Sequence, residues 1–226
     1  MKKISIILIF TLFSSISLAH IGHYKDYSKI EMDIFRNGKL IGYSNYLFER
    51  NENNTVIINQ TKFSVKILGA KIFQIEGYSE EKYLKDQLIS FTSKTKQNDK
   101  QKFVNLVFDK DSNKFNIKGS SYEGKASVDN IIGNWWNHKI LQANSQISPI
   151  SGSIKEQIVT FVGKDKIEQY GKVYDVDHFT IKSKDMSLPK DKRLDFNIWY
   201  DKEKSLIIRI SYSRLGNWEY RLKNLE

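Results

Sequence analysis

The sequence predicts an all-β protein built on one large, curved antiparallel sheet, a half-barrel whose concave face is covered by one helical or loop segment. Stretches in which apolar and polar residues alternate follow one another along most of the chain. Short turns rich in Asn, Asp and Gly separate these stretches, and Asn37-Gly38 is the strongest hairpin signal among them. Long strands joined in sequence favour a wide curled sheet over a compact sandwich.

The first half of the chain predicts a meander of strands. Tyr27–Arg36 alternates, with Ile30, Met32 and Ile34 on one face and charged residues on the other. Asn37-Gly38 then turns the chain, because both residues tolerate positive φ angles. The same pattern continues between further polar turns. We therefore expect strands over residues 27–36, 39–50, 55–68, 71–83, 88–96, 103–108 and 115–117.

The alternation fails between Ser120 and Ser153. This stretch contains Trp135-Trp136, Pro149 and a helix or loop around residues 129–142. A connection this long in a β protein usually has a function or covers a sheet face, so we expect it to cover the concave face. Strand patterns return over residues 154–162, 166–170, 174–181, 194–200, 206–212 and 218–222, and no linker divides residues 20–226, which we interpret as one domain.

Residues 1–19 have the pattern of a secretory signal peptide. Lys2 and Lys3 give a positive start, residues 4–13 form an apolar core, and small residues end the segment at Ser17-Leu18-Ala19. The apolar core is too short to cross roughly 30 Å of hydrocarbon as a helix. We therefore expect cleavage near the end of this segment and export of the rest of the chain to the periplasm, without a transmembrane segment.

The composition narrows the possible classes of protein further. The chain has no cysteine, which excludes disulfides, thiolate metal sites, a cysteine nucleophile and a lipidated cysteine anchor. Its net charge is +10, and loss of Lys2 and Lys3 would reduce that value by two. The remaining lysines are scattered rather than clustered. We interpret them as a solvated outer face, and we expect no nucleic-acid partner.

Several short motifs resemble one protein family. They are Phe35–Gly42, Phe63–Gly69, Asn134–Asn137, and Asp195–Asp201 followed by Trp218–Leu222. Together they resemble a family of exported bacterial proteins known only as a domain of unknown function. That family is distantly similar to periplasmic domains with curled-sheet folds like those of the LolA and LolB lipoprotein carriers. The resemblance implies a periplasmic home and a large antiparallel sheet, and it brings no known activity and no catalytic residues.

Apolar side chains expected on the concave face are the candidate ligand-binding residues. They are Phe63, Val65, Phe73, Ile75, Phe91 and Phe103, with Trp135 and Trp136 as a lid. Adjacent tryptophans point in different directions on any regular element, so one can seal the sheet while the other stays near solvent. Two interpretations stay open: the tryptophans close the core, or they line the mouth of an apolar cavity or stack on a sugar ring.

The sequence contains no motif for nucleophilic catalysis or phosphate binding, so we predict no catalytic residues and no cofactor, although a pair of carboxylates stays open. Cleavage after Ala19 would make His20 an N-terminal copper ligand, with His23, His138 or His178 completing a site that resembles copper-dependent polysaccharide monooxygenases. Signal cleavage often leaves an arbitrary first residue, and we assign no metal ligand on this basis.

The sequence therefore favours a non-enzymatic, exported protein that binds or carries an apolar or amphiphilic ligand, such as a lipid, an acyl chain or a lipoprotein segment. A curled sheet leaves an apolar concave face that side chains, a helix or a ligand must fill. Two alternatives stay open. One is a structural or interaction protein of the cell envelope whose basic outer face meets peptidoglycan, anionic lipid or a partner protein. The other is a copper-binding enzyme that uses His20.

Overall fold

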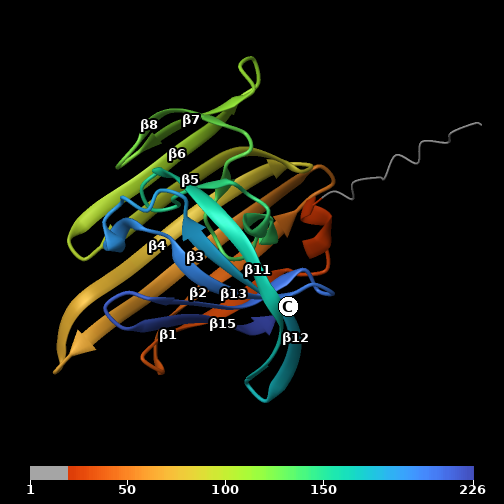
Figure 1. Cartoon of the computed structure of the whole chain (residues 1–226). Coiled ribbons are helices and arrows are strands. Elements are labelled where there is room, and N and C mark those ends of the chain that lie inside the picture. The colour runs from red at the N-terminus through yellow and green to blue at the C-terminus, as the bar shows by residue number, and fades with distance from the viewer. Residues whose placement is uncertain (1–19) are drawn as a thin grey trace, which may run out of the picture.

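The computed structural model describes residues 20–226, whose strands form one curled, open sheet (Figure 1). The strands are β1 (Lys29–Arg36), β2 (Lys39–Arg50), β3 (Asn54–Ile67), β4 (Ala70–Leu84), β5 (Gln87–Gln97), β6 (Lys100–Asp109), β7 (Lys114–Gly119), β8 (Glu123–Ser127), β9 (Ile131–Ile132), β10 (Ser145–Ile147), β11 (Ile154–Gln169), β12 (Lys172–Ser183), β13 (Asp195–Asp201), β14 (Leu206–Ser213) and β15 (Asn217–Leu225). Three short 3-10 helices accompany them in these residues: η1 (His20–Tyr24), η2 (His138–Leu141) and η3 (Lys190–Lys192). The predicted all-β class and curved antiparallel sheet are confirmed, and the predicted signal peptide lies outside the described residues.

The order of the strands explains why the sheet curls. β1 pairs with β15 in the middle of the sheet, and β8 and β9 form its two edges. All neighbouring strands are antiparallel except β9 and β10. The chain passes from the end of β8 at Ser127 to the start of β9 at Ile131. Four residue steps span at most about 14 Å, so the two edges of the sheet must lie close together. The sheet is therefore rolled into a barrel-like shape that stays open.

The strand boundaries differ from the sequence-based expectation in the middle of the chain. The alternation predicts no strand over residues 120–127, whereas Glu123–Ser127 forms the edge strand β8. This strand has one buried side chain, Ala126, and its pattern is too weak to predict. The alternation also predicts separate strands over 154–162 and 166–170. They form one strand, β11, because pairing with β12 continues past a bulge between Phe161 and Gly163.

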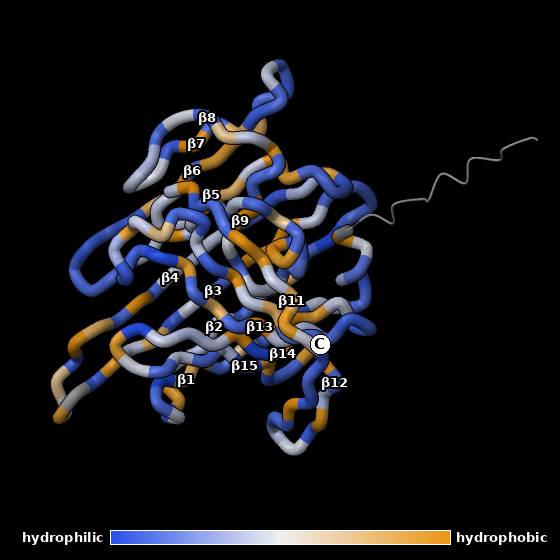
Figure 2. The backbone as a smooth tube through the Cα atoms, in the orientation of Figure 1, coloured by the Kyte–Doolittle hydropathy of each residue, from blue (hydrophilic) through white to orange (hydrophobic). Residues whose placement is uncertain are grey.

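The core lies on the inner face of the sheet, which the buried apolar residues of the strands face. Figure 2 shows hydrophobic and hydrophilic residues following one another along the strands. A main cluster lies beneath the segment that covers the concave face, and it contains the fully buried Trp136, Phe91 and Phe115. A smaller cluster lies nearer to one end of the sheet. It consists of Ile34, Phe63, Val65, Ile75 and Trp218.

Gly42 of β2 allows the smaller cluster to form. The rings of Phe63 on β3 and Trp218 on β15 lie 5.5 Å apart between centroids, although β1 and β2 separate their strands. A Cβ atom at Gly42 would lie 2.0 Å from the carbonyl oxygen of Lys62 and 2.4 Å from Cβ of Phe63. The space that a side chain would occupy at residue 42 is therefore already filled by β3.

We predict that Gly42→Ala lowers the free energy of unfolding by about 1–3 kcal/mol, because the methyl group must displace β3. Urea denaturation measures this change. Gly77→Ala is the matched control on the same inner face, since the nearest atom to its added Cβ would be Oγ1 of Thr95 at 3.5 Å, an ordinary contact. Equal losses for the two variants would contradict the close packing that we describe at Gly42.

Candidate ligand-binding face

The segment between β8 and β11 covers the concave face and is fixed to both sides of the curled sheet. On one side, the Ser93 hydroxyl of β5 donates a hydrogen bond to the Pro149 carbonyl at 2.6 Å. On the other, Nε2 of Gln157 in β11 donates to the carbonyls of Ile140 and Ala143, each at 2.9 Å. The predicted cover is thus present, and it consists of β9, η2, β10 and the loops between them rather than a long helix.

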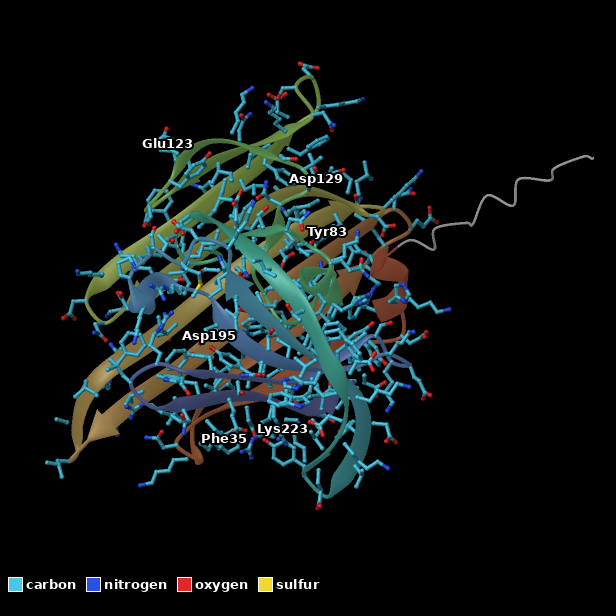
Figure 3. The ribbon with its side chains drawn as sticks, viewed as in Figure 1. Phe35, Tyr83, Glu123, Asp129, Asp195 and Lys223 are labelled. Carbon is cyan, nitrogen blue, oxygen red and sulfur yellow. The ribbon has the colours of Figure 1, made fainter. Side chains whose placement is uncertain are left out.

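Trp136 is the side chain with which this cover enters the core. Its indole is 1% exposed and makes edge-to-face contacts with the rings of Tyr24, Phe48 and Tyr83, at centroid distances of 5.1, 5.6 and 6.0 Å. Tyr83, which is labelled in Figure 3, belongs to β4, and Phe48 belongs to β2. Trp136 therefore fills the centre of the concave face, as in the interpretation that a tryptophan closes the core.

Glu81 of β4 holds Trp136 in place from the floor of the sheet. Oε1 of Glu81 accepts a hydrogen bond from the indole Nε1 of Trp136 at 2.9 Å and another from the side-chain amide of Asn134. Oε2 accepts one from the Tyr83 hydroxyl at 2.7 Å. Burial raises the pKa of Glu81 to about 7, although the hydrogen bonds from Trp136 and Tyr83 act in the opposite direction. The carboxyl group thus links two residues of the cover to the sheet.

Helix η1 closes the same end of the core. The Tyr24 hydroxyl accepts a hydrogen bond from the backbone N–H of His138 at 3.0 Å, and its oxygen lies 2.6 Å from Nδ1 of that histidine. Burial raises the pKa of Tyr24 well above its usual range, so the hydroxyl stays protonated. Guanidinium Nη2 of Arg50 donates to the Tyr24 carbonyl at 2.7 Å. The N-terminal end of the described chain is therefore packed against the cover.

Trp135 points away from Trp136 and joins a continuous row of aromatic rings, which we call the aromatic row. The row consists of Phe73, Phe63, Trp218, Tyr212, Phe196 and Trp135, with successive centroids 5.9, 5.5, 5.8, 5.4 and 5.1 Å apart. It runs along the inner face from β4 to β13 and ends on the cover. The rings of Tyr212 and Trp218 are stacked, and the other neighbours are tilted or edge-to-face.

The aromatic row is more accessible than the main core. Phe73, Phe196, Tyr212 and Trp135 are half-buried, whereas Trp136 and Phe91 are fully buried. Farther along the same face, Phe161 of β11 is 54% exposed and its ring lies 5.4 Å from that of Phe179. Aromatic faces bind acyl chains and apolar rings through dispersion and the release of water. This part of the concave face therefore presents aromatic rings that are only partly covered by the rest of the fold.

A groove of about 680 Å³ lies on the opposite, outer face of β1, β2 and β3. Its lining includes Asp33, Lys39, Tyr43, Lys66 and Lys223. Asp33 is an outward residue between the inward Met32 and Ile34, and it accepts a hydrogen bond from the Tyr170 hydroxyl at 2.8 Å. The charged lining of this groove does not suit an apolar ligand.

The structure brings together part of the predicted ligand-binding set. Phe63, Phe73 and Trp135 belong to the aromatic row, and Val65 and Ile75 pack in the smaller cluster behind it. Phe91 and Trp136 lie in the main core. Phe103 does not face inward as predicted. Val104 and Leu106 of β6 are buried on the inner face, and Phe103 therefore lies on the outer face with Asn105. The sequence of β6 has apolar residues on both faces and therefore does not indicate which face is turned to the core.

Sequence reasoning missed half of the aromatic row. Phe196, Tyr212 and Trp218 come from the last three strands, more than 100 residues after Phe73, and join it because β15 pairs with β1. The alternation of apolar and polar residues in these strands was the only local indication that the three rings face inward. The sequence also did not reveal that Glu81 binds the cover, because its partners Asn134 and Trp136 lie more than 50 residues away in the chain.

His23, His138 and His178 do not gather at one point. His178 lies on the outer face, where its ring stacks on Trp199 with centroids 4.8 Å apart and Nε2 lies 3.0 Å from Oδ1 of Asn197. The exposed His23 and the buried His138 are neighbours, with ring centroids 5.3 Å apart. Within residues 20–226, no group of three or more histidine or carboxylate side chains has a geometry that could hold a metal ion.

We predict that the protein is more stable at pH 5 than at pH 8. The pKa of Glu81 is higher in the folded state than in the unfolded state, so its stabilising contribution is complete below about pH 4.5 and is lost as the pH rises through 7. Urea denaturation across this range measures the effect. Glu81→Gln keeps a neutral partner for Trp136 and Tyr83 and should remove this part of the pH dependence. An unchanged pH dependence in Glu81→Gln would contradict the assignment, because the histidines are the same in both proteins.

Comparison with known proteins agrees with the fold and gives the family. A crystal structure of a β-barrel-like protein of domain of unknown function DUF1849 from Brucella abortus matches 88% of this chain and 95% of its own, with a TM-score of 0.57 and 10% identity. A DUF1329 family protein from Desulfovibrio piger covers 91% of the chain at 11% identity, but its TM-score of 0.20 supports no conclusion. A comparison with curated proteins finds no match. The family model named domain of unknown function DUF6134 matches residues 32–223, and the chain therefore belongs to this family.

Proposed function

We propose that this protein is a non-enzymatic binding or carrier protein for an apolar or amphiphilic molecule, such as a lipid or an acyl chain, and that it acts after export to the periplasm. The observation that supports binding is the aromatic row, a line of rings on the inner face of the sheet in which Phe73, Phe196, Tyr212 and Trp135 are half-buried. The signal-peptide pattern of residues 1–19 supports export. Within residues 20–226, no helix is long and apolar enough to cross a membrane.

The different positions of Trp135 and Trp136 support this function. Trp136 is held by Glu81 and fills the centre of the face, so the fold is complete without a ligand. Trp135 is half-buried at the edge of the cover, with its ring 5.1 Å from Phe196 and 6.3 Å from Tyr220. A ligand that lies along the aromatic row would therefore contact Trp135 and Phe196 without displacing the core.

Binding of a fluorescent fatty acid, dansyl-undecanoic acid, and its displacement by palmitate test the proposal. We expect saturable binding that is weakened about tenfold by Phe196→Ala, a loss that corresponds to removing one well-packed aromatic contact. The matched control is Trp199→Ala in the same strand, β13, where the ring lies on the outer face and stacks on His178. We expect Trp199→Ala to leave the affinity unchanged.

Two results would contradict the proposal. One is the absence of displaceable binding in a protein whose thermal unfolding shows that it is folded. The other is an equal effect of Phe196→Ala and Trp199→Ala, which would place the probe elsewhere than on the aromatic row.

A further inference from the structure

One end of the curled sheet carries five chain segments that we call the basic rim: residues 36–39, 64–73, 97–100, 184–194 and 214–216. They lie at the same end because antiparallel neighbours reverse direction at every turn. Backbone N–H of Asn37 donates to the Asn217 carbonyl at 2.7 Å, and Nη2 of Arg214 donates to the Arg193 carbonyl at 2.9 Å. Figure 1 shows these turns together at the left of the view.

The β3–β4 hairpin projects furthest from the rim. The pairing of β3 with β2 ends at Phe63, and the pairing of β4 with β5 ends at Ile75. The residues between them pair with one another as a two-stranded ribbon that extends past both neighbouring strands (Figure 1). Most of the end of this ribbon is coloured as hydrophobic in Figure 2. Val65 and Phe73 near the base of the ribbon pack in or against the smaller cluster, whereas Leu68 at its tip is fully exposed.

Two leucines at the rim are exposed in a way that folding does not explain. Leu68 and Leu215 are 102% and 90% exposed, and their φ angles are +48° and +50°. Positive φ is unfavourable for a bulky side chain and is tolerated best by Gly and Asn. The neighbouring turns of the rim have asparagine at the corresponding residues, Asn37 and Asn98, with φ of +49° and +52°. Leucine in this conformation therefore lowers the stability of the fold, and no packing contact offsets the loss.

Charge distinguishes the rim from the other end of the sheet. The five rim segments contain ten basic and three acidic residues. The turns at the opposite end, residues 51–53, 85–86, 110–113, 170–171 and 202–205, contain four of each. Further exposed apolar side chains of the rim, Ile72 and Met186, belong to segments that also contain basic residues. Separate apolar side chains at the tips of basic loops match the interface of an anionic bilayer rather than a groove on a protein.

We propose that the basic rim docks this protein on the surface of a lipid bilayer that contains anionic headgroups. Leu68 and Leu215 insert among the acyl chains, and the lysines and arginines of the rim contact lipid phosphates. The aromatic row begins at the rim, because its first ring, Phe73, is the last residue of one rim segment. A second member of the row, Trp218, donates from Nε1 to the carbonyl of the rim residue Arg214 at 2.8 Å. Docking would therefore bring the aromatic row to the lipid surface, but it does not depend on the proposed carrier function.

Flotation with vesicles tests the docking. Residues 20–226, which contain every described strand, are used because residues 1–19 are themselves apolar and would bind lipid. We expect binding to vesicles of phosphatidylglycerol and phosphatidylcholine, and little binding to phosphatidylcholine alone. Binding should weaken when NaCl is raised from 0.15 to 0.5 M, as expected for headgroup contacts. Lys66→Gln combined with Lys71→Gln should reduce both the binding and its dependence on salt.

The double variant Leu68→Asn/Leu215→Asn decides the proposal. We expect at least tenfold weaker binding together with an equal or higher melting temperature, because asparagine suits positive φ better than leucine. Leu84→Asn, an exposed leucine at the other end of β4, is the matched control and should bind normally. Unchanged vesicle binding by the double variant, equal binding to neutral vesicles, or a lowered melting temperature would each overturn the proposal. Displacement of the fluorescent fatty acid by palmitate should stay unchanged in this variant, which separates docking from the carrier function.

Discussion

The hydrogen bonds of Glu81 are the interaction on which the arrangement of the concave face depends. The curled sheet would otherwise present a wide apolar surface to water, which is unfavourable in proportion to its area. The cover removes the centre of that surface from water, and Glu81 determines where the cover sits by accepting hydrogen bonds from Asn134, Trp136 and Tyr83. A buried carboxyl group is costly unless it is paired in this way. The position of Trp136 therefore determines which part of the face is filled and which part stays accessible.

The accessible part and the basic rim lie at the same end of the molecule. The cover and η1 close the other end, where Tyr24 packs on Trp136 and contacts His138. The aromatic row begins beside the β3–β4 ribbon and passes behind the β14–β15 turn. A single rolled sheet thus carries both a buried core and a more exposed row of aromatic rings. This separation follows from the pairing of β1 with β15, which brings Phe63 and Trp218 into contact over Gly42.

The amino-acid sequence was sufficient to predict the fold class, most of the strands and the covering segment, because alternation and turn residues act locally. Asn37-Gly38 and Asn98 are examples, since their side chains suit the positive φ that the structure shows. The site depended on long-range pairing that no local pattern contains. Nothing near Phe73 in the chain indicates Trp218 or Phe196, and nothing near Glu81 indicates Trp136. Phe103 was placed on the wrong face because a strand with apolar residues on both faces, such as β6, does not reveal which face is buried.

The titration of the Glu81 carboxyl group tests the central claim most directly. Its ¹³C chemical shift can be followed from pH 3 to pH 9 and assigned by its loss in Glu81→Gln. If the cover excludes water from Glu81 beneath Trp136, the midpoint of this titration should lie near pH 7. A midpoint near 4.5, the ordinary value for a glutamate in water, would show that the carboxyl group is solvated and that the cover is not held against the sheet as described.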